Sequence, residues 1–214
     1  MGPGPNSKQQ FGGSLLAVNF RDQTTHWAEI VNAHVRAIIV TVHTFIKDVL
    51  EAVVLDQRIR EELWEAALVT KLSEAYKAAL DESDFLLRIE RDMRPSTCSA
   101  SYKEDARKAQ AARERAGQGN SEYLTEYLHD ILQGYYKVSL QRFVDIICRQ
   151  VVEHRLLHGK NSPLKVLTPK FVTAMDDDKL NMIAGEDALT RRERERLTAE
   201  IAGLEEATEK IFRG

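Results

Sequence analysis

The feature that most constrains this chain is an apolar repeat of helical spacing that continues well beyond the length of an ordinary helix. From Asp22 to about Leu55, an apolar side chain returns every three or four positions, which places these side chains on one helical face. A helix of this length runs on the order of 50 Å at about 1.5 Å per residue, which suits a helical bundle. The repeat comprises Trp27, Val31, Ile38, Val42, Phe45, Val49 and Val53, with His34 or Val35 in the remaining turn.

Two further long helices are predicted on either side of a polar gap. Asp56 offers a side-chain oxygen to the first amides of the second helix, which runs to about Arg91. The third helix opens at Asn120 or Ser121 and ends at Gly159, which is typical of a helix C-terminus. The pattern of a few long apolar stripes predicts an all-α fold.

The C-terminal part is predicted to hold short helices and one longer helix. Thr168 followed by Pro169 indicates a helix start, and Asp176 begins a second short helix. Thr190 and Glu193 have the spacing of a capping box that opens the last helix. Its apolar residues alternate in four- and three-residue steps, which is typical of a docking or coiled-coil helix. We expect docking through Leu197, Ile201, Leu204 and Ile211.

Two segments are predicted to be without fixed structure. Residues 1–20 have the composition of a disordered tail, either natural or added. Residues 94–120 lose the apolar period and predict a flexible basic loop with a local net charge of +3, with transient helix over its Ala-rich middle as the alternative. Such a loop attracts anionic headgroups at about 1 kcal/mol per well-placed cation, and a solvated linker is the alternative. The candidate contacts are Lys103, Arg107, Lys108, Arg113 and Arg115.

Composition limits the partners and the compartment of the chain. A net charge of −3 over 214 residues describes a surface of mixed sign and predicts no nucleic-acid partner. Cys98 and Cys148 lack the spacing of a disulfide framework or a zinc site, which favours a reducing compartment. The longest apolar run, residues 37–42, is far shorter than the ~20 residues of a membrane span. We therefore expect a cytoplasmic chain, free or peripheral to a membrane.

No motif for chemistry emerges, so we predict no catalytic, cofactor or metal residue and no enzyme activity for this chain alone. Residues 159–162, Gly-Lys-Asn-Ser, lack the upstream glycine of a phosphate-binding loop and are interpreted as a helix C-cap. His154 and His158 are four apart but have no third metal ligand nearby in sequence. Residues 176–178, three consecutive Asp, are interpreted as a helix N-terminus because calcium loops need ligands at alternate positions.

Several short segments give the C-terminal half a resemblance to the GTPase effector domain of the dynamin superfamily, most closely to fungal dynamin-like and Mx-like members. Residues 21–92, with Trp27, His34-Val35 and Phe85-Leu86-Leu87, look like the last two helices of the middle region of that family. The segments of the C-terminal half that carry the resemblance are YYKVSLQRFVD at 135–145, QVVE at 150–153, LNMIAGED at 180–187 and RRERERL at 191–197.

The resemblance implies an elongated antiparallel bundle of three long helices, followed by short helices and a returning C-terminal helix. Residues 21–93 would supply two stalk helices, and residues 94–120 the tip loop that meets a membrane or another target. Residues 121–214 would form the GTPase effector domain. Its last helix would belong to the bundle signalling element beside the GTPase domain of the full-length protein.

The function implied by the resemblance is mechanical. The chain would mediate self-assembly of a dynamin-like large GTPase and couple GTP hydrolysis to membrane remodelling, without catalysis of its own. Its partners would be further copies of itself, the GTPase domain and an anionic membrane. The alternative function is a standalone helical adaptor that binds partner helices and has no connection to GTPases.

Overall fold

The computed structural model describes residues 15–116 and 121–213, and these ranges contain helices and no strand. The predicted all-α fold is thereby confirmed. Within the described ranges, the side chains of residues 113, 116, 121–124 and 213 are not described.

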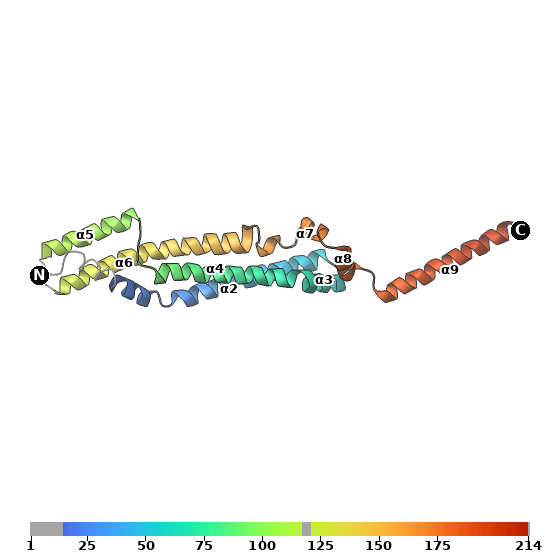
Figure 1. The fold of residues 1–214 in the computed structure, drawn as a ribbon, viewed down its shortest axis with the longest axis horizontal. Coiled ribbons are helices and arrows are strands. Elements are labelled where there is room, and N and C mark those ends of the chain that lie inside the picture. Colours follow the sequence, from blue (N-terminus) through green and yellow to red (C-terminus); the bar gives the residue numbers. More distant parts are fainter. Residues whose placement is uncertain (1–14, 117–120, 214) are drawn as a thin grey trace. The chain divides into compact units, whose positions relative to one another are not determined.

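The chain divides into two compact units, each assembled from separate stretches of sequence. The first unit comprises Met1–Val49 and Thr70–Val166, and the second comprises Leu50–Val69 and Leu167–Gly214. The helices labelled in Figure 1, together with three short π- or 3₁₀-helical segments named η, follow in this order: α2 (Trp27–Val53), α3 (Gln57–Leu63), η1 (Trp64–Leu68), α4 (Val69–Asp92), α5 (Ala100–Ala116), α6 (Ser121–Ile146), η2 (Ile147–His158), η3 (Pro163–Lys165), α7 (Pro169–Thr173), α8 (Asp177–Ala184) and α9 (Ala188–Arg213).

Helical structure begins earlier than predicted, in residues 15–23, and a turn at Thr24 to His26 precedes α2. At this turn the Thr24 hydroxyl donates to the carbonyl of Phe20, at 2.8 Å, and local bonds of this kind compete with helix continuation. The prediction of a disordered tail is wrong for residues 15–20, since Phe20 is buried in the core. The remainder of the predicted tail, 1–14, lies outside the described residues.

Aromatic rings form the centre of the first unit. Trp27 stacks on Phe143 with ring centroids 5.1 Å apart and an interplanar angle of 8°. Phe20 meets Tyr135 edge to face at 5.0 Å. Aromatic pairs of these geometries add about 0.5–1.5 kcal/mol each beyond the burial of their area. Val151 of η2, which is fully buried, extends the same core.

Contacts between side chains give the direction of each helix in the first unit. Arg91 of α4 donates to the Thr24 hydroxyl at 3.0 Å, so the end of α4 lies beside the start of α2 and these helices are antiparallel. The pairs Phe20–Tyr135 and Trp27–Phe143 advance together along both partners, so α2 and α6 run in the same direction. It follows that α4 is antiparallel to both of them.

The segment predicted as a flexible loop contains a helix, α5, so the loop prediction is wrong for residues 100–116. Ser99 receives a long hydrogen bond from the amide of Tyr102, 3.5 Å, at the helix start. Tyr102 meets Tyr135 of α6 edge to face at 5.9 Å, and Ala109 is buried. The packed face of α5 is thus built from one tyrosine and small alanines, which make a weak apolar period. Residues 117–120 of the predicted loop lie outside the described residues.

In the second unit, the predicted helix starts are confirmed at three positions. The side chains of Asp56, Thr168 and Asp176 accept hydrogen bonds from backbone amides three residues further on. Such caps contribute about 1 kcal/mol each. Arg58 of α3 donates to the carbonyl of Gly185 at 2.8 Å, which joins α3 to the end of α8.

The last helix starts earlier than its predicted capping box. Asp187, and not Thr190, caps α9, because its carboxylate accepts from the amides of Leu189 and Thr190, both at 2.9 Å. The hydrogen bond from the Thr190 hydroxyl, followed by these amide bonds, lowers the pKa of Asp187. Glu193 instead binds Arg196, with distances of 2.7 and 3.0 Å. An ionised Asp at a helix start also opposes the positive end of the helix dipole.

We predict that Gly159→Ala destabilises the protein, because Gly159 ends η2 in a space too small for a side chain. An added Cβ would lie 2.0 Å from the carbonyl oxygen of His154, so the chain must shift at a cost of about 1–3 kcal/mol. Chemical denaturation followed by circular dichroism measures this. Gly203→Ala is the control, since a Cβ there meets nothing within 4 Å and alanine favours the helix. Equal stability of the Gly159 variant and the unmodified protein would contradict the prediction.

Candidate interaction surfaces

The residues considered for chemistry have structural roles. Gly159 ends η2 and donates to the carbonyl of His154, which confirms the interpretation as a helix C-cap. His158 lies 2.9 Å from Glu153 at an exposed position. In the described ranges, no group of three or more His, Cys, Asp or Glu side chains is placed to hold a metal ion. The absence of enzyme activity stays a prediction.

One spacing was missed in the sequence. Glu126 and His129 have the Glu-x-x-His spacing that carboxylate-bridged metal sites use in helical bundles, where two such motifs and further carboxylates face inward. Both side chains are exposed on α6. His129 lies 3.8 Å from its neighbour Asp130. This spacing therefore assembles no metal site in the described part of the chain.

A buried polar cluster joins α4 to α6. Glu90 of α4 accepts from the hydroxyl of Ser139 and from the guanidinium of Arg142, whose Nε lies 3.0 Å from Oε2. The Glu90 side chain is only 7% exposed, and this bond to Glu90 is the main reason why the pKa of Arg142 is raised. Arg142 also donates to the carbonyl of Ser96, at 3.3 Å. Charge-assisted bonds of this kind fix the register of the two helices.

A second polar contact lies between α2 and α4. The hydroxyl of Tyr76 is 3.5 Å from Nδ1 of His43. Burial raises the pKa of Tyr76 to about 12, so its hydroxyl stays protonated at neutral pH. Burial, followed by the charge of Lys47, lowers the pKa of His43. Both shifts favour the neutral forms of the two side chains.

We predict that Glu90→Ala destabilises the first unit. The change leaves the fully buried Ser139 hydroxyl without its acceptor and Arg142 without its carboxylate, at a cost of about 1–3 kcal/mol. Urea denaturation gives the free energy of unfolding. Glu104→Ala is the control, because Glu104 forms an exposed pair with Lys108 at 3.8 Å, and such pairs contribute about 0–1 kcal/mol. Equal effects of the two substitutions would show that the buried cluster does not stabilise the unit.

An apolar groove of about 400 Å³ lies between α2 and the continuous helix formed by α6 and η2. Its floor includes the stacked rings of Trp27 and Phe143. On its rim, Ile30 is 63% exposed and Val144 is 49% exposed. Apolar side chains this exposed along a groove are typical of an interaction surface.

Helix α2 is unusually apolar for a helix so little buried. Of the helices in the described ranges, it alone is long and apolar enough to cross a membrane, and only 17% of its most apolar window is buried. Length and composition do not assign it to a membrane, because core helices of soluble proteins and signal sequences pass the same test. Its exposed residues include Val40, Phe45 and Val49. Its buried positions, such as Val35 and Val42, make up only part of its surface.

The predicted basic contacts lie on α5. The helix packs on α6 through Tyr102 and Ala109, and burial is the main reason why the pKa of Tyr102 is raised. Of the predicted contacts, Lys103, Arg107, Lys108 and Arg115 are exposed, and the side chain of Arg113 lies outside the described residues. Lys108 is 3.8 Å from Glu104, so part of its charge is compensated. Membrane contact through these residues stays a prediction.

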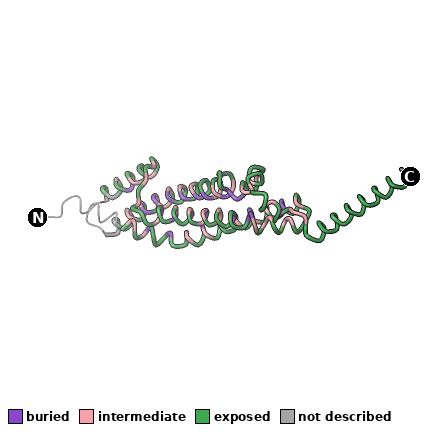
Figure 2. Tube along the Cα trace, turned by 45° about the vertical axis from the view of Figure 1, so that its right-hand side comes forward, coloured by how far each residue is buried: buried purple, intermediate pink, exposed green. Residues whose placement is uncertain are grey.

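The predicted docking residues of α9 are all exposed, as is every described side chain from Asp187 to Phe212 (Figure 2). Among the four predicted docking residues, the exposed fraction ranges from 45% at Leu197 to 77% at Ile211. Leu197 and Ile201 border an open apolar hollow along the first half of α9, flanked by Arg194. The apolar stripe predicted from the spacing thus exists, and docking through it stays a prediction.

Comparison of the chain with protein-family models, with curated proteins and with solved structures found no match. The fold and surfaces by themselves define an all-α protein with two apolar helix surfaces that are uncovered in the described residues. The first is the groove between α2 and α6, and the second is the stripe on α9.

Proposed function

We propose that this chain is an assembly module, similar to the stalk and GTPase effector region of dynamin-like GTPases. In this role it forms oligomers through apolar helix surfaces and couples GTP hydrolysis by the GTPase domain of the full-length protein to membrane remodelling. The chain itself carries out no catalysis, and it acts in the cytoplasm at the membrane surface. The resemblance in short sequence segments is the reason for choosing this family.

The observation that carries the proposal is the uncovered groove between α2 and α6. Its rim residues Ile30 and Val144 are about half exposed or more, and each fully buried aliphatic side chain contributes roughly 1.5–3 kcal/mol. In addition, α2 and α6 run in the same direction, so a fourth helix antiparallel to both would complete a four-helix bundle. A helix from another copy fits this requirement, and so does a helix of a different protein.

Filling of the groove by a helix of a different protein supports the alternative function, a standalone helical adaptor that binds partner helices. Two observations separate the alternatives. A P-loop domain encoded in the same reading frame favours the dynamin-like function. A chain that remains monomeric at high micromolar concentration, yet binds added amphipathic helices, favours the adaptor.

We predict that Val144→Arg weakens self-association at least tenfold. The substitution places an unpaired charge in the apolar groove, where burial costs several kcal/mol. Sedimentation velocity over a concentration series measures the change. Gln150→Arg is the matched control, because it adds the same charge at an exposed position outside the groove. Unchanged association of the Val144 variant would exclude the groove as an assembly surface.

We predict that the chain binds anionic vesicles weakly and that binding fades as salt is added. The triple change Lys103→Glu, Arg107→Glu and Lys108→Glu should reduce binding at least tenfold, at about 1 kcal/mol per cation. Vesicle sedimentation measures the bound fraction. The control carries the same change in charge elsewhere, at the exposed residues Lys77, Lys160 and Lys170. Equal losses in both variants would mean that net charge, and not α5, determines binding.

A further inference from the structure

The apolar stripe on α9 has the geometry of a coiled-coil seam. Leu197, Leu204 and Ile211 are seven residues apart, and Ile201 lies between the first two in a four-then-three step. This places the three residues at heptad position d and Ile201 at position a, with Thr208 at the next a. Exposure of 57% at Ile201 and 63% at Leu204 leaves the centre of the seam uncovered.

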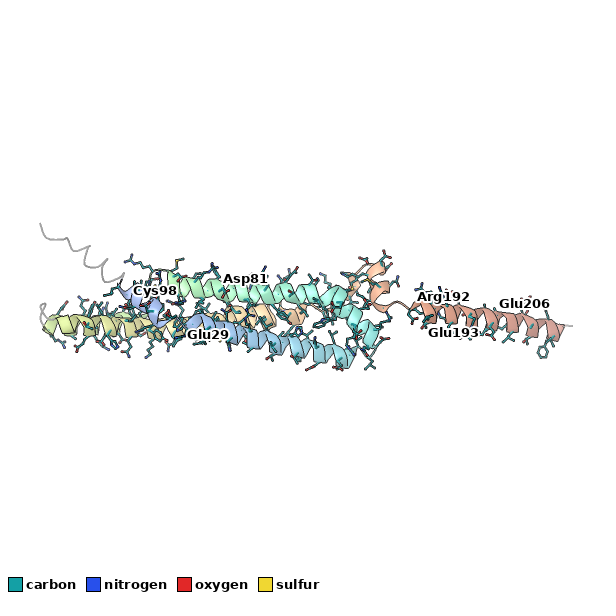
Figure 3. The ribbon with its side chains drawn as sticks, turned by 90° about the horizontal axis from the view of Figure 1, so that it is seen from below. Glu29, Asp81, Cys98, Arg192, Glu193 and Glu206 are labelled. Carbon is teal, nitrogen blue, oxygen red and sulfur yellow. The ribbon has the colours of Figure 1, made fainter. Side chains whose placement is uncertain are left out.

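Two charged pairs on α9 lie outside the core of this seam, whereas Arg194, which binds Glu186 at 3.0 Å, occupies the a position before Ile201. Arg196 binds Glu200 at 3.2 Å, and Lys210 binds Glu206 at 2.6 Å. Arg196 and Lys210 occupy position c and Glu206 position f, on the solvent side of a coiled coil. Figure 3 shows the side chains of α9, among them Glu206, projecting from the helix. These pairs support the isolated helix and leave its apolar stripe free for a partner.

The flanking charges distinguish between two orientations of an α9 pair. Glu200 occupies position g, and Glu205 occupies position e of the following heptad. In a parallel pair, position g of one helix faces position e of the next heptad in the other. Glu200 of each copy would then face Glu205 of the other copy, which gives two contacts between like charges. Like charges in these positions destabilise a pair.

An antiparallel pair avoids this repulsion. With Ile201 opposite Leu204 of the second copy, position g faces g and position e faces e. Glu200 then faces Ala207, and Glu205 faces Thr198. Leu197 lies opposite Thr208, and Arg194, at the a position before Ile201, lies opposite Ile211 at each end of the seam.

We propose that α9 pairs with α9 of a second copy as an antiparallel two-stranded coiled coil, centred between Ile201 and Leu204. The pairing specifies one contact of the self-association in the proposed function. Its biological role rests on that proposed function, but the pairing itself needs no GTPase domain. An antiparallel pair has two-fold symmetry and closes as a dimer. The groove between α2 and α6 remains available for a separate contact.

Sedimentation velocity of the full chain at high micromolar concentration tests the pairing. We use Val144→Arg as the background, so that association through the groove is suppressed. In this background a dimer is expected to remain, and adding Leu204→Asp is expected to weaken it at least tenfold. Gly203→Ala lies at outward position c and is expected to preserve the dimer. Circular dichroism verifies that each variant keeps its helical content, which is expected because Leu204 is 63% exposed.

The outcomes separate the pairing from the proposed groove contact. A dimer that survives Leu204→Asp, or a Val144→Arg chain that is already monomeric, overturns the α9 pairing. An unmodified chain whose association is lost through Leu204→Asp but is insensitive to Val144→Arg supports the pairing and contradicts the groove contact. If α9 docks on a different protein instead, the chain and all of its variants should be monomeric in these samples. That result overturns the pairing.

Cross-linking tests the orientation in a background with Cys98→Ser and Cys148→Ser, since both native thiols are exposed. A mixture of Glu200→Cys chains and Ala207→Cys chains is expected to form mixed dimers with a short thiol-specific cross-linker. Thr208→Cys alone is expected to form none, because it faces Leu197 in the antiparallel pair. Efficient cross-linking of Thr208→Cys to its own copy would show a parallel pair. Absence of the mixed dimers would also overturn the antiparallel arrangement.

Discussion

The first unit depends on the stack of Trp27 on Phe143, which joins α2 to α6 at a ring separation of 5.1 Å. The pair of Phe20 and Tyr135, seven and eight residues away, extends the contact by about two helical turns and requires the two helices to run in the same direction. Since helices joined by short connections are antiparallel, the parallel pair is possible only because α4 returns between them. The same stack forms the floor of the groove, so the packing that builds the core also leaves the groove uncovered.

The buried cluster around Glu90 adds precision to this packing. Apolar faces alone tolerate small shifts of one helix along another, whereas a carboxylate held by Ser139 and Arg142 has one satisfactory register. Arg155 of η2 binds Glu82 of α4 at 2.8 Å and repeats the constraint further along the same helix pair. These contacts set the position of one groove wall, α6 with η2, relative to α4. Polar contacts from Arg91 and Tyr76 of α4 to Thr24 and His43 relate α4 to the other wall, α2.

The sequence was sufficient for the extent of the long helices and for three of the caps, because these depend on residues close together in the chain. Asp56 is one example. The capping box at Thr190 was wrong, and the C-terminal part of the α2 stripe, with Phe45 and Val53, is exposed. Helix α5 was missed because Tyr102 and small alanines give little apolar period, and their burial depends on the surface of α6. The Glu90 cluster was missed for a related reason, since Glu90 and Arg142 are 52 positions apart. The apolar stripe of α9 could be predicted directly from the spacing of its residues. The partner of this stripe could not be predicted from the sequence.

The two uncovered surfaces differ in symmetry, and this difference determines what they can build. A pair of α9 helices is two-fold and ends at a dimer, whereas a groove filled by a different surface of the next copy extends without closing. If both proposed contacts form, the chain would build an open assembly of dimers. The α9 stripe covers one side of a single helix, so pairing with a second copy and docking on a GTPase domain exclude each other. A GTPase domain that took α9 would therefore remove the two-fold contact while leaving the groove contact intact.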